Sequence, residues 1–429
     1  MSNLNELYNV PFVNRPVSGS IRPPGSKSIT NRALICAAAA RDKSVLRNAL
    51  DSEDTQVMVT ALNQLGLDVR WEGPNLLVDG GIKRIKEPES EIFVANSGTT
   101  IRFLGALLAG VGGTFRLNGV ARMEQRPIKD LVDALRQLGV DAKCSETGCP
   151  PLWFDSHGFH SSNCKIKGDI SSQYLSGLLM AAPLASNALS ISVDGDLVSV
   201  PYIDITLEVM NAFGVSVRCD QYREFSIPAT STYRGTVYDI EPDASAASYF
   251  FALAAITQGE ITVSGLGKNA IQGDIAFVEC LEAMGCEVEY TESSITVIGK
   301  PLKGIDVDMN AISDTVPTLG VVALFANGTT NIRNVEHVRH KETDRITDLA
   351  RELIKLGADV DERPDGLSIT PVKMNAAEIE TYNDHRMAMS FAIAGTMIDG
   401  VTIHDPACCE KTYPKFFDDL VELLEVGDG

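Results

Sequence analysis

One pattern recurs six times along the 429 residues of the chain and constrains its fold more than any other feature. Each copy has an apolar residue, two other residues, a second apolar residue and then a glycine. The glycines are Gly66, Gly139, Gly214, Gly285, Gly357 and, in a weaker copy, Gly427. They are 73, 75, 71, 72 and 70 residues apart, which indicates an internal repeat. Each copy predicts an amphipathic helix that ends at a glycine cap, and alternating residues predict a strand after five of them.

A second pattern has the same period. Polar residues precede helices rich in small apolar residues, near Ser28, Ser97, Ser171, Asp243, Asp314 and Asp384. Because these helices are apolar nearly all round, we expect them to be buried, with their N-termini facing a common direction. For the first and fifth helices, the expected ranges are 33–40 and 316–326. The two patterns predict an α/β fold of six units, each with two helices and several strands.

The chain is too long for a single typical core, so we expect two domains of three units each. The midpoint of the six units, between the third and the fourth, falls near Glu241. The strand-like segment 10–21 precedes the first unit, and we expect it to pair with the second half of the chain. These observations predict a discontinuous domain of residues 1–22 plus 241–429, and an inserted domain of residues 23–240.

The turn at Pro24–Arg32 combines glycine, hydroxyls and two cations at the start of a helix. Such a turn favours an anion, because helix N-terminal amides point outward without partners. The whole chain nevertheless carries a formal charge of -20, which argues against nucleic acid or an anionic membrane as its main partner. No apolar run is long enough to span a membrane and residues 1–10 do not resemble a signal peptide, so we expect a cytoplasmic protein or a mature protein whose targeting segment is absent. Ser20 stands where a phosphate-binding P-loop has its first glycine, which argues against a kinase or ATPase function.

Other polar clusters stand at equivalent points of the repeat. They are Asn96–Arg102, Glu124–Pro127, Ser171–Gln173, Lys341–Arg345, Asn383–Arg386 and Lys411. Asp314 stands before an apolar helix and is a candidate general base. Any one cluster alone is also typical of a helix cap on a solvated surface, and Lys341–Arg345 is also typical of a solvated helix turn. Their common period favours a shared binding site for an anionic ligand.

Ten short segments match one pattern: Pro24–Ser28, Asn31-Arg32, Asn96–Thr99, Arg126–Ile128, Ser171–Gln173, Gly195–Ser199, Pro201–Asp204, Asp243–Ser245, Lys341–Arg345 and Tyr382–Arg386. Taken together, they resemble the EPSP synthase family, which belongs to the enolpyruvyl transferases. The resemblance extends from Ile21 to Tyr413. It implies transfer of the enolpyruvyl group of phosphoenolpyruvate to the 5-hydroxyl of shikimate 3-phosphate, with release of phosphate and without metal or cofactor. It also implies two similar domains, each an inverse α/β barrel of three βαβαββ repeats, with a cleft between them. We further expect a monomer without a nucleic-acid or membrane partner.

The resemblance also implies roles for individual residues. Shikimate 3-phosphate would be bound by Lys27, Ser28, Arg32, Ser171, Ser172, Gln173, Ser199, Tyr202, Asp314, His337 and Lys341. Phosphoenolpyruvate would be bound by Lys27, Asn96, Gly98, Arg126, Gln173, Arg345, Arg386 and Lys411. The catalytic residues would be Lys27, in contact with both substrates, Asp314, which accepts the 5-hydroxyl proton, and Glu342, which protonates the methylene carbon.

Two positions depart from the pattern of the family. His337 stands where many members have asparagine, and Phe103 stands where proline is common, whereas Gly98 is the small residue that a glyphosate-sensitive site requires. One alternative is the sister enzyme that uses UDP-N-acetylglucosamine, but Cys144 and Cys149 are poorly placed for its loop cysteine. A non-catalytic anion-binding protein is another alternative. It predicts the loss of one of the two catalytic carboxylates, and both are present.

Overall fold

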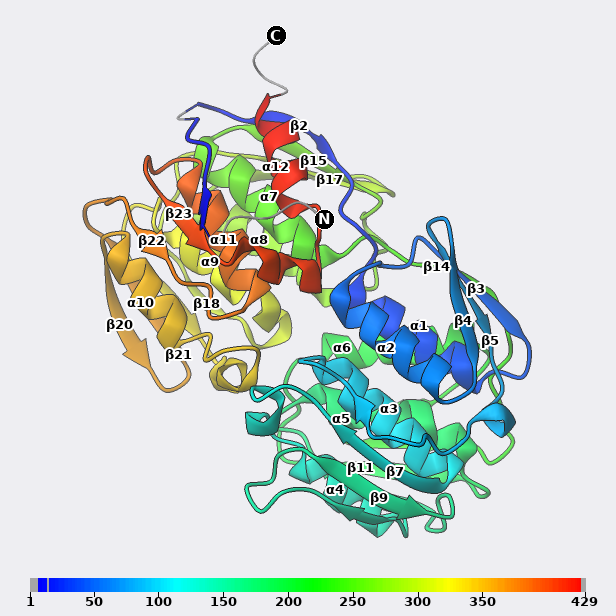
Figure 1. Ribbon diagram of the computed structural model, residues 1–429. Helices are drawn as coiled ribbons and strands as arrows, with labels where there is room; N and C mark the ends of the chain where they lie inside the picture. The colour runs from blue at the N-terminus through cyan, green and yellow to red at the C-terminus, as the bar shows by residue number, and fades with distance from the viewer. Residues whose placement is uncertain (1–6, 14, 426–429) are drawn as a thin grey trace. The chain divides into compact units, whose positions relative to one another are not determined.

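The computed structural model describes residues 7–13 and 15–425 and divides into two compact units (Figure 1). The discontinuous unit is Met1–Pro24 with Pro242–Gly429, and the inserted unit is Gly25–Glu241. The sequence placed these boundaries after residues 22 and 240. The described residues include no helix with both the length and the apolar character needed to cross a bilayer.

The inserted unit contains three four-stranded sheets with one common order. In the spatial order given below, the first two strands of each sheet are parallel, the third lies antiparallel to the second, and the fourth lies antiparallel to the third at an edge. The first sheet is β14 (Val237–Asp239), β3 (Lys43–Arg47), β5 (Asn75–Asp79) and β4 (Asp68–Glu72). The second is β6 (Ile92–Phe93), β7 (Gly113–Asn118), β9 (Leu152–Ser156) and β8 (Asp141–Lys143). The third is β10 (Asn163–Lys167), β11 (Leu189–Asp194), β13 (Glu224–Ile227) and β12 (Arg218–Asp220).

Three helices form the core of the inserted unit: α1 (Lys27–Ala39), α3 (Gly98–Val111) and α5 (Ser172–Ala181). They are buried along most of their length and contact one another. Three others bury only one face, and they are α2 (Glu53–Gln64), α4 (Lys129–Gln137) and α6 (Pro201–Ala212). Short 3-10 turns are η1 (Ile82–Arg84), η2 (Met123–Gln125) and η3 (Ala182–Leu184). Because α1, α3 and α5 are apolar nearly all round, they lie in the core of the unit.

The discontinuous unit repeats this plan. Its first sheet is β16 (Glu287–Tyr290), β17 (Ser294–Ile298), β15 (Glu260–Ser264) and β2 (Ser18–Ile21). Its second sheet is β18 (Asp306–Asp308), β19 (Thr330–Arg333), β21 (Gly366–Pro371) and β20 (Ala358–Arg363). Its third sheet has three strands, β1 (Leu7–Asn9), β23 (Thr402–His404) and β22 (Glu378–Ile379). Its buried helices are α7 (Ala244–Thr257), α9 (Val316–Ala323) and α11 (His385–Gly395). The remaining helices are α8 (Phe277–Met284), α10 (Thr347–Lys355), α12 (Phe416–Glu425), η4 (Gly273–Ala276), η5 (Asn310–Thr315), η6 (Glu336–His340) and η7 (Pro406–Lys411). The α/β class expected from the sequence is confirmed.

Strands near the unit boundaries pair far along the chain. β2 directly precedes α1, yet it lies parallel to β15, with Ser18 opposite Glu260. β14 directly precedes α7, yet it lies parallel to β3. The sixth repeat ends at α12, and β1 pairs with β23 in the position that a fourth strand occupies in the other sheets. Each unit is therefore completed by strands that come from a distant part of the sequence.

Glycine ends the helices as the repeat predicts. The five glycines that end the first five copies, Gly66, Gly139, Gly214, Gly285 and Gly357, all have φ between +87° and +122°. This left-handed conformation is the one a helix C-terminal cap requires, and glycine adopts it without a steric cost. The sixth, Gly427, lies outside the described residues.

A helix begins near each of the six predicted polar starts, and at four of them the named residue is the cap. Ser97, Ser171, Asp243 and Asp384 accept a backbone N–H from the helix that each begins. Near Ser28, α1 begins at Lys27, and Ser26 caps it. Asp314 lies within η5, two residues before α9 begins at Val316. The Asp314 carboxylate binds cationic side chains, as described below.

Candidate active site

In the inserted unit, polar side chains meet where α3 and α5 begin. Arg126 donates from Nη1 to the backbone oxygen of Asn96 at 2.9 Å and to its side-chain oxygen at 3.2 Å. Arg102 donates to Oε1 of Gln173 at 2.8 Å. A methyl group on Gly98 would lie 2.5 Å from Nη1 of Arg102 and 2.6 Å from Nη2 of Arg126, so both guanidiniums pack against this glycine. The structure thus brings together Asn96, Gly98, Arg126 and Gln173, all of which the sequence analysis named.

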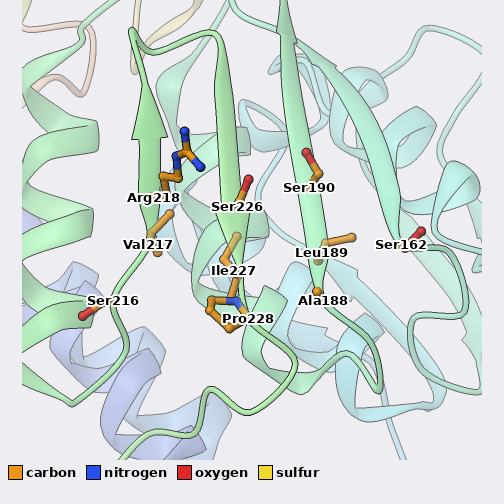
Figure 2. Close-up of a pocket in the computed structure, with 10 residues that line it drawn as sticks. All are labelled: Ser162, Ala188, Leu189, Ser190, Ser216, Val217, Arg218, Ser226, Ile227 and Pro228. Carbon is orange, nitrogen blue, oxygen red and sulfur yellow. The ribbon is translucent and has the colours of Figure 1, made fainter.

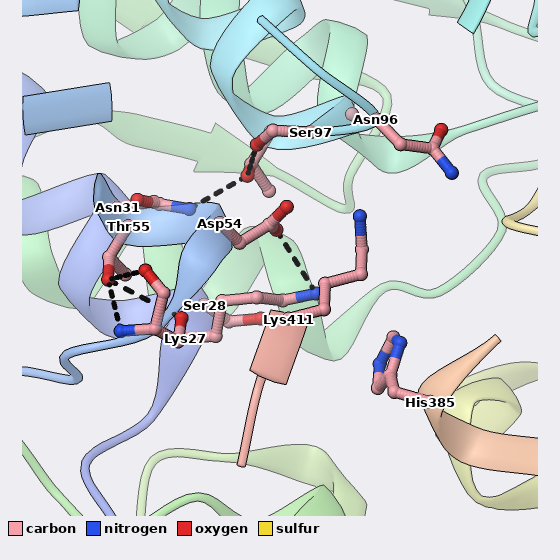
Figure 3. Close-up of polar contacts among 12 residues, drawn as sticks. Lys27, Ser28, Asn31, Asp54, Thr55, Asn96, Ser97, His385 and Lys411 are labelled. Carbon is pink, nitrogen blue, oxygen red and sulfur yellow. Dashed lines mark hydrogen bonds and ion pairs between the residues drawn. The ribbon is translucent and has the colours of Figure 1, made fainter. Parts of the chain in front are cut away.

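Lys27 lies at the first residue of α1, with its ammonium 3.5 Å from the carboxylate of Asp54 at the start of α2 (Figure 3). Both side chains are largely buried, which strengthens their attraction. One turn further along α1, Asn31 donates to the hydroxyl of Thr99 at 2.8 Å and ties α1 to α3. The sequence analysis missed Asp54, because an acidic residue in the first turn of a helix is a common stabilising feature.

Arg32 is 1% exposed and has four hydrogen-bond acceptors within its own unit. It donates to the hydroxyls of Thr206 and Ser176 and to the backbone oxygens of Ser28 and Tyr202. Burial lowers the pKa of this guanidinium to about 10. These contacts join α1 to α5 and α6, so Arg32 stabilises the arrangement of the helices. A direct contact with shikimate 3-phosphate stays a prediction.

The remaining predicted residues of this unit lie at helix starts. Ser28 is in the first turn of α1, Ser171 caps α5, and Ser172 is the first residue of α5. Ser199 has a φ of 54° and lies just before α6, and Tyr202 is the second residue of that helix. The positions of Ser28, Ser171 and Ser172 follow the second pattern of the repeat, in which polar residues precede the buried helices, whereas Ser199 and Tyr202 belong to the start of α6.

In the discontinuous unit, Asp314 is surrounded by three cations. Its carboxylate lies 2.7 Å from Nη2 of Arg386, 3.1 Å from Nη1 of Arg345 and 3.6 Å from Nζ of Lys341. The Asp314 side chain is 14% exposed, so solvent reaches it while the cations hold it in place. Opposite charges this close favour the ionised carboxylate, which is the form a general base needs.

Arg345 connects Asp314 to two further carboxylates. Its Nε and Nη2 donate to Asp384 at 2.7 and 3.1 Å, and Nη2 also donates to Glu342 at 2.8 Å. Lys411 lies 3.9 Å from the other oxygen of Glu342. Arg345 is 1% exposed and Asp384 is fully buried, so their geometry is fixed. The sequence analysis gave Asp384 as a helix start and as part of the cluster Asn383–Arg386, and it missed the pairing of Asp384 with Arg345.

The segment Lys341–Arg345 is not a helix turn. It is a bend between η6 and α10, so the helical spacing that the sequence suggested for Lys341 and Arg345 does not hold. Asp344 accepts the backbone N–H groups of Ile346 and Thr347 at 3.1 Å, as a capping residue does at the start of α10. Lys341 and Arg345 nevertheless meet, because both contact Asp314.

The family of the chain follows from comparisons with known proteins. The model of the EPSP synthase (3-phosphoshikimate 1-carboxyvinyltransferase) family matches residues 13–420. The chain belongs to the EPSP synthase family. The 3-phosphoshikimate 1-carboxyvinyltransferase of Shewanella halifaxensis is 47% identical over 98% of this chain and 100% of its own. The same enzyme of Shewanella loihica is 45% identical over 95% of this chain and 97% of its own. The structure is similar to an EPSP synthase from Acinetobacter baumannii, with a TM-score of 0.81, 26% identity and coverage of 99% of this chain and 98% of that one.

Two cavities of this EPSP synthase family member are lined by residues outside the candidate site. A cavity of about 640 Å³ lies on the sheet that contains β11, β12 and β13 (Figure 2). Arg218 is the charged residue in its lining, which includes none of the predicted site residues. A second cavity, of about 600 Å³, is lined by Arg41, Lys83 and Arg84, and it too lacks those residues.

We expect Gly98→Ala to raise the KM for phosphoenolpyruvate by about 10- to 100-fold, because its methyl group displaces the Arg102 and Arg126 guanidiniums. The fold tolerates the change, since these groups end flexible side chains. Steady-state kinetics and the melting temperature test this. Gly105→Ala is the matched control on α3, because its methyl group would meet the apolar side chain of Leu152 at 2.8 Å. Equal KM values in wild type and Gly98→Ala would contradict the prediction.

His337 gives the protein a specific dependence on pH. Burial, together with nearby Lys341 and His340, lowers its pKa from the ordinary 6.5 to about 3, although Asp314 acts in the opposite direction. Between these two values the unfolded chain binds more protons than the native protein. Stability therefore falls as the pH drops from about 6.5 toward 3, with a contribution from His337 of up to about 1.4 kcal/mol per pH unit.

We expect His337→Asn to flatten the fall in melting temperature between pH 6.5 and 4, because asparagine does not titrate in this range. Differential scanning calorimetry at several pH values measures the effect as a difference between wild type and variant. His160→Asn, at an exposed position, is the control. Parallel curves for wild type and His337→Asn would show that His337 does not carry the effect.

Proposed function

We propose that this family member transfers the enolpyruvyl group of phosphoenolpyruvate to the 5-hydroxyl of shikimate 3-phosphate, giving 5-enolpyruvylshikimate 3-phosphate and phosphate. One observation supports this most directly. Asp314 and Glu342 are both contacted by Arg345, beside Lys341, Arg386 and Lys411. Two carboxylates can move protons, while the four cations neutralise the phosphate and carboxylate groups of the substrates.

The reaction divides into addition and elimination. Glu342 delivers a proton to the methylene carbon of phosphoenolpyruvate, which becomes a methyl group and leaves the adjacent carbon electron-deficient. The 5-oxygen of shikimate 3-phosphate forms a bond to that carbon, and Asp314 accepts the hydroxyl proton. The resulting tetrahedral intermediate returns a methyl proton to the Glu342 carboxylate and releases the phosphate group, which restores the carbon–carbon double bond. The cations stabilise the anionic groups throughout.

Residues of the inserted unit are proposed to bind the substrates. Lys27 and Arg126 supply positive charge for phosphate and carboxylate oxygens, and Asn96 fixes Arg126. Ser28, Ser171, Ser172 and Ser199 offer hydroxyl groups that can donate to phosphate or accept from a ring hydroxyl. Gln173 is held by Arg102, which leaves its amide N–H₂ group as a donor for substrate.

Release of phosphate from phosphoenolpyruvate tests the proposal. We expect release with shikimate 3-phosphate as acceptor, together with a new enol ether visible by NMR. UDP-N-acetylglucosamine is the second acceptor, and faster release with it would favour the sister reaction. Release with neither acceptor, from folded protein that still binds both anions, would favour a non-catalytic binding protein.

We also propose that the protein acts as a monomer in the cytoplasm, without a nucleic-acid or membrane partner. The acidic composition supports the absence of such partners, because a charge of -20 repels anionic surfaces. Light scattering measures the mass of the protein in solution, and a mass near 46.2 kDa is expected. A mass of twice that value would contradict the monomer.

A further inference from the structure

A strained turn leads into α11. Tyr382 and Asn383 both have positive φ, of 54° and 55°, and the N–H of Asp384 donates to the backbone oxygen of Thr381 at 2.9 Å. Two consecutive left-handed residues are typical of a type I′ turn, which glycine or asparagine normally forms. A bulky residue such as Tyr382 has this conformation only when its surroundings enforce it.

Glu352 holds this turn. It lies on α10, it is fully buried, and its two carboxylate oxygens have different partners. One accepts the hydroxyl of Tyr382 at 2.6 Å, and the other accepts the backbone N–H of Glu380 at 3.1 Å and lies 2.7 Å from Nζ of Lys355. Burial and the neighbouring Glu352 carboxylate raise the pKa of Tyr382, so its hydroxyl stays protonated and donates.

The turn positions the residues that follow it. Asp384 caps α11 by accepting the N–H of Arg386 at 2.9 Å, and it holds Arg345 through two hydrogen bonds. Arg386 and Arg345 both contact Asp314. Displacing the turn therefore moves both arginines. The N-terminal end of α10 follows the bend Lys341–Arg345. There Thr343 donates to Asp348, and Asp344 accepts the backbone N–H groups of Ile346 and Thr347.

We propose that Glu352 and Tyr382 are positioning residues that set the binding of phosphoenolpyruvate by holding Arg345 and Arg386 in place. The proposal rests on the function proposed above, which assigns these two arginines to that substrate. Neither Glu352 nor Tyr382 has a role in the predicted site. Their effect is carried by Asp384, which links the turn to both arginines.

Tyr382→Phe is the main test, because phenylalanine keeps the ring and the backbone preferences of tyrosine and removes only the hydroxyl. We expect the KM for phosphoenolpyruvate to rise about 5- to 50-fold, in keeping with the loss of a hydrogen bond to a buried charge. The KM for shikimate 3-phosphate should rise less than that for phosphoenolpyruvate, since the arginines are assigned to phosphoenolpyruvate and reach the other substrate through Asp314. Glu352→Gln retains the size of the side chain, removes the charge and should have the same selective effect.

Tyr233→Phe is the matched control. It also removes a tyrosine hydroxyl that makes a hydrogen bond, here from the buried Tyr233 to the backbone oxygen of Met180 in the other unit, at 2.9 Å, whereas Tyr382 is half-buried. We expect it to lower the melting temperature and to leave both KM values unchanged. If Tyr382→Phe and Glu352→Gln behave like this control, or raise both KM values equally, the inference is wrong. Failure of the proposed function is distinguishable, because wild type itself would then release no phosphate.

Discussion

Replacing Asp314 by alanine is expected to lower kcat by about 10²–10⁴-fold, the usual contribution of a positioned acid or base. Its carboxylate lies among Arg386, Arg345 and Lys341, which hold it in one place and favour its charged form.

The KM for phosphoenolpyruvate separates two roles of Asp314. If it is the base, kcat falls while this KM stays the same or decreases, because both arginines lose a competing carboxylate. If it only anchors the arginines, the KM rises and kcat changes little. Asp306→Ala is the control, since it removes a carboxylate that pairs with Arg333 at 2.5 Å on the surface of the same unit.

Glu342→Gln is expected to lower kcat by a similar factor, about 10²–10⁴-fold, through the loss of the proton that reaches the methylene carbon. The amide oxygen of glutamine can still accept the hydrogen bond from Nη2 of Arg345, now at 2.8 Å, so the local structure is kept. We therefore expect the affinity for phosphoenolpyruvate to change little.

Hydrogen exchange at the methylene carbon tests this step directly. In D₂O with both substrates present, wild type should incorporate deuterium into that carbon, and Glu342→Gln should do so more slowly by the same factor as kcat. Glu336→Gln, at an exposed position six residues earlier, is the control. Normal exchange in Glu342→Gln would assign the proton transfer to another group.

The repeat made most of the architecture predictable. A period near seventy residues located the helix ends at Gly66, Gly139, Gly214, Gly285 and Gly357, because glycine caps depend on local backbone conformation. The start of α1 was placed six residues late, since Lys27-Ser-Ile-Thr-Asn-Arg32 looks polar although most of it is buried in the structure. Packing against the rest of the fold buries these polar residues within the helix, and a local sequence pattern does not reveal this burial.

Site residues that belong to short sequence motifs could be predicted. Contacts between residues of different repeats could not. Lys341, Glu342 and Arg345 were named from one short segment, but their meeting with Asp384 depends on folding. Asp54, Asp384 and Glu352 were missed as partners for the same reason. An acidic residue on a helix is usually a cap or a solvated side chain, and sequence alone does not identify the distant cation or hydroxyl that it binds.

The pairing of strands across the chain also affects the order in which the protein can fold during synthesis. The inserted unit has all its strands once β14 has left the ribosome at residue 239. β1, by contrast, pairs with residues 402–404 and waits about 20–80 s for them at common translation rates. During that interval the inserted unit can fold first, as a nascent domain, while the earliest residues of the chain remain without their partners. Synonymous codons that slow translation after residue 241 would lengthen this interval without altering any residue of the finished protein.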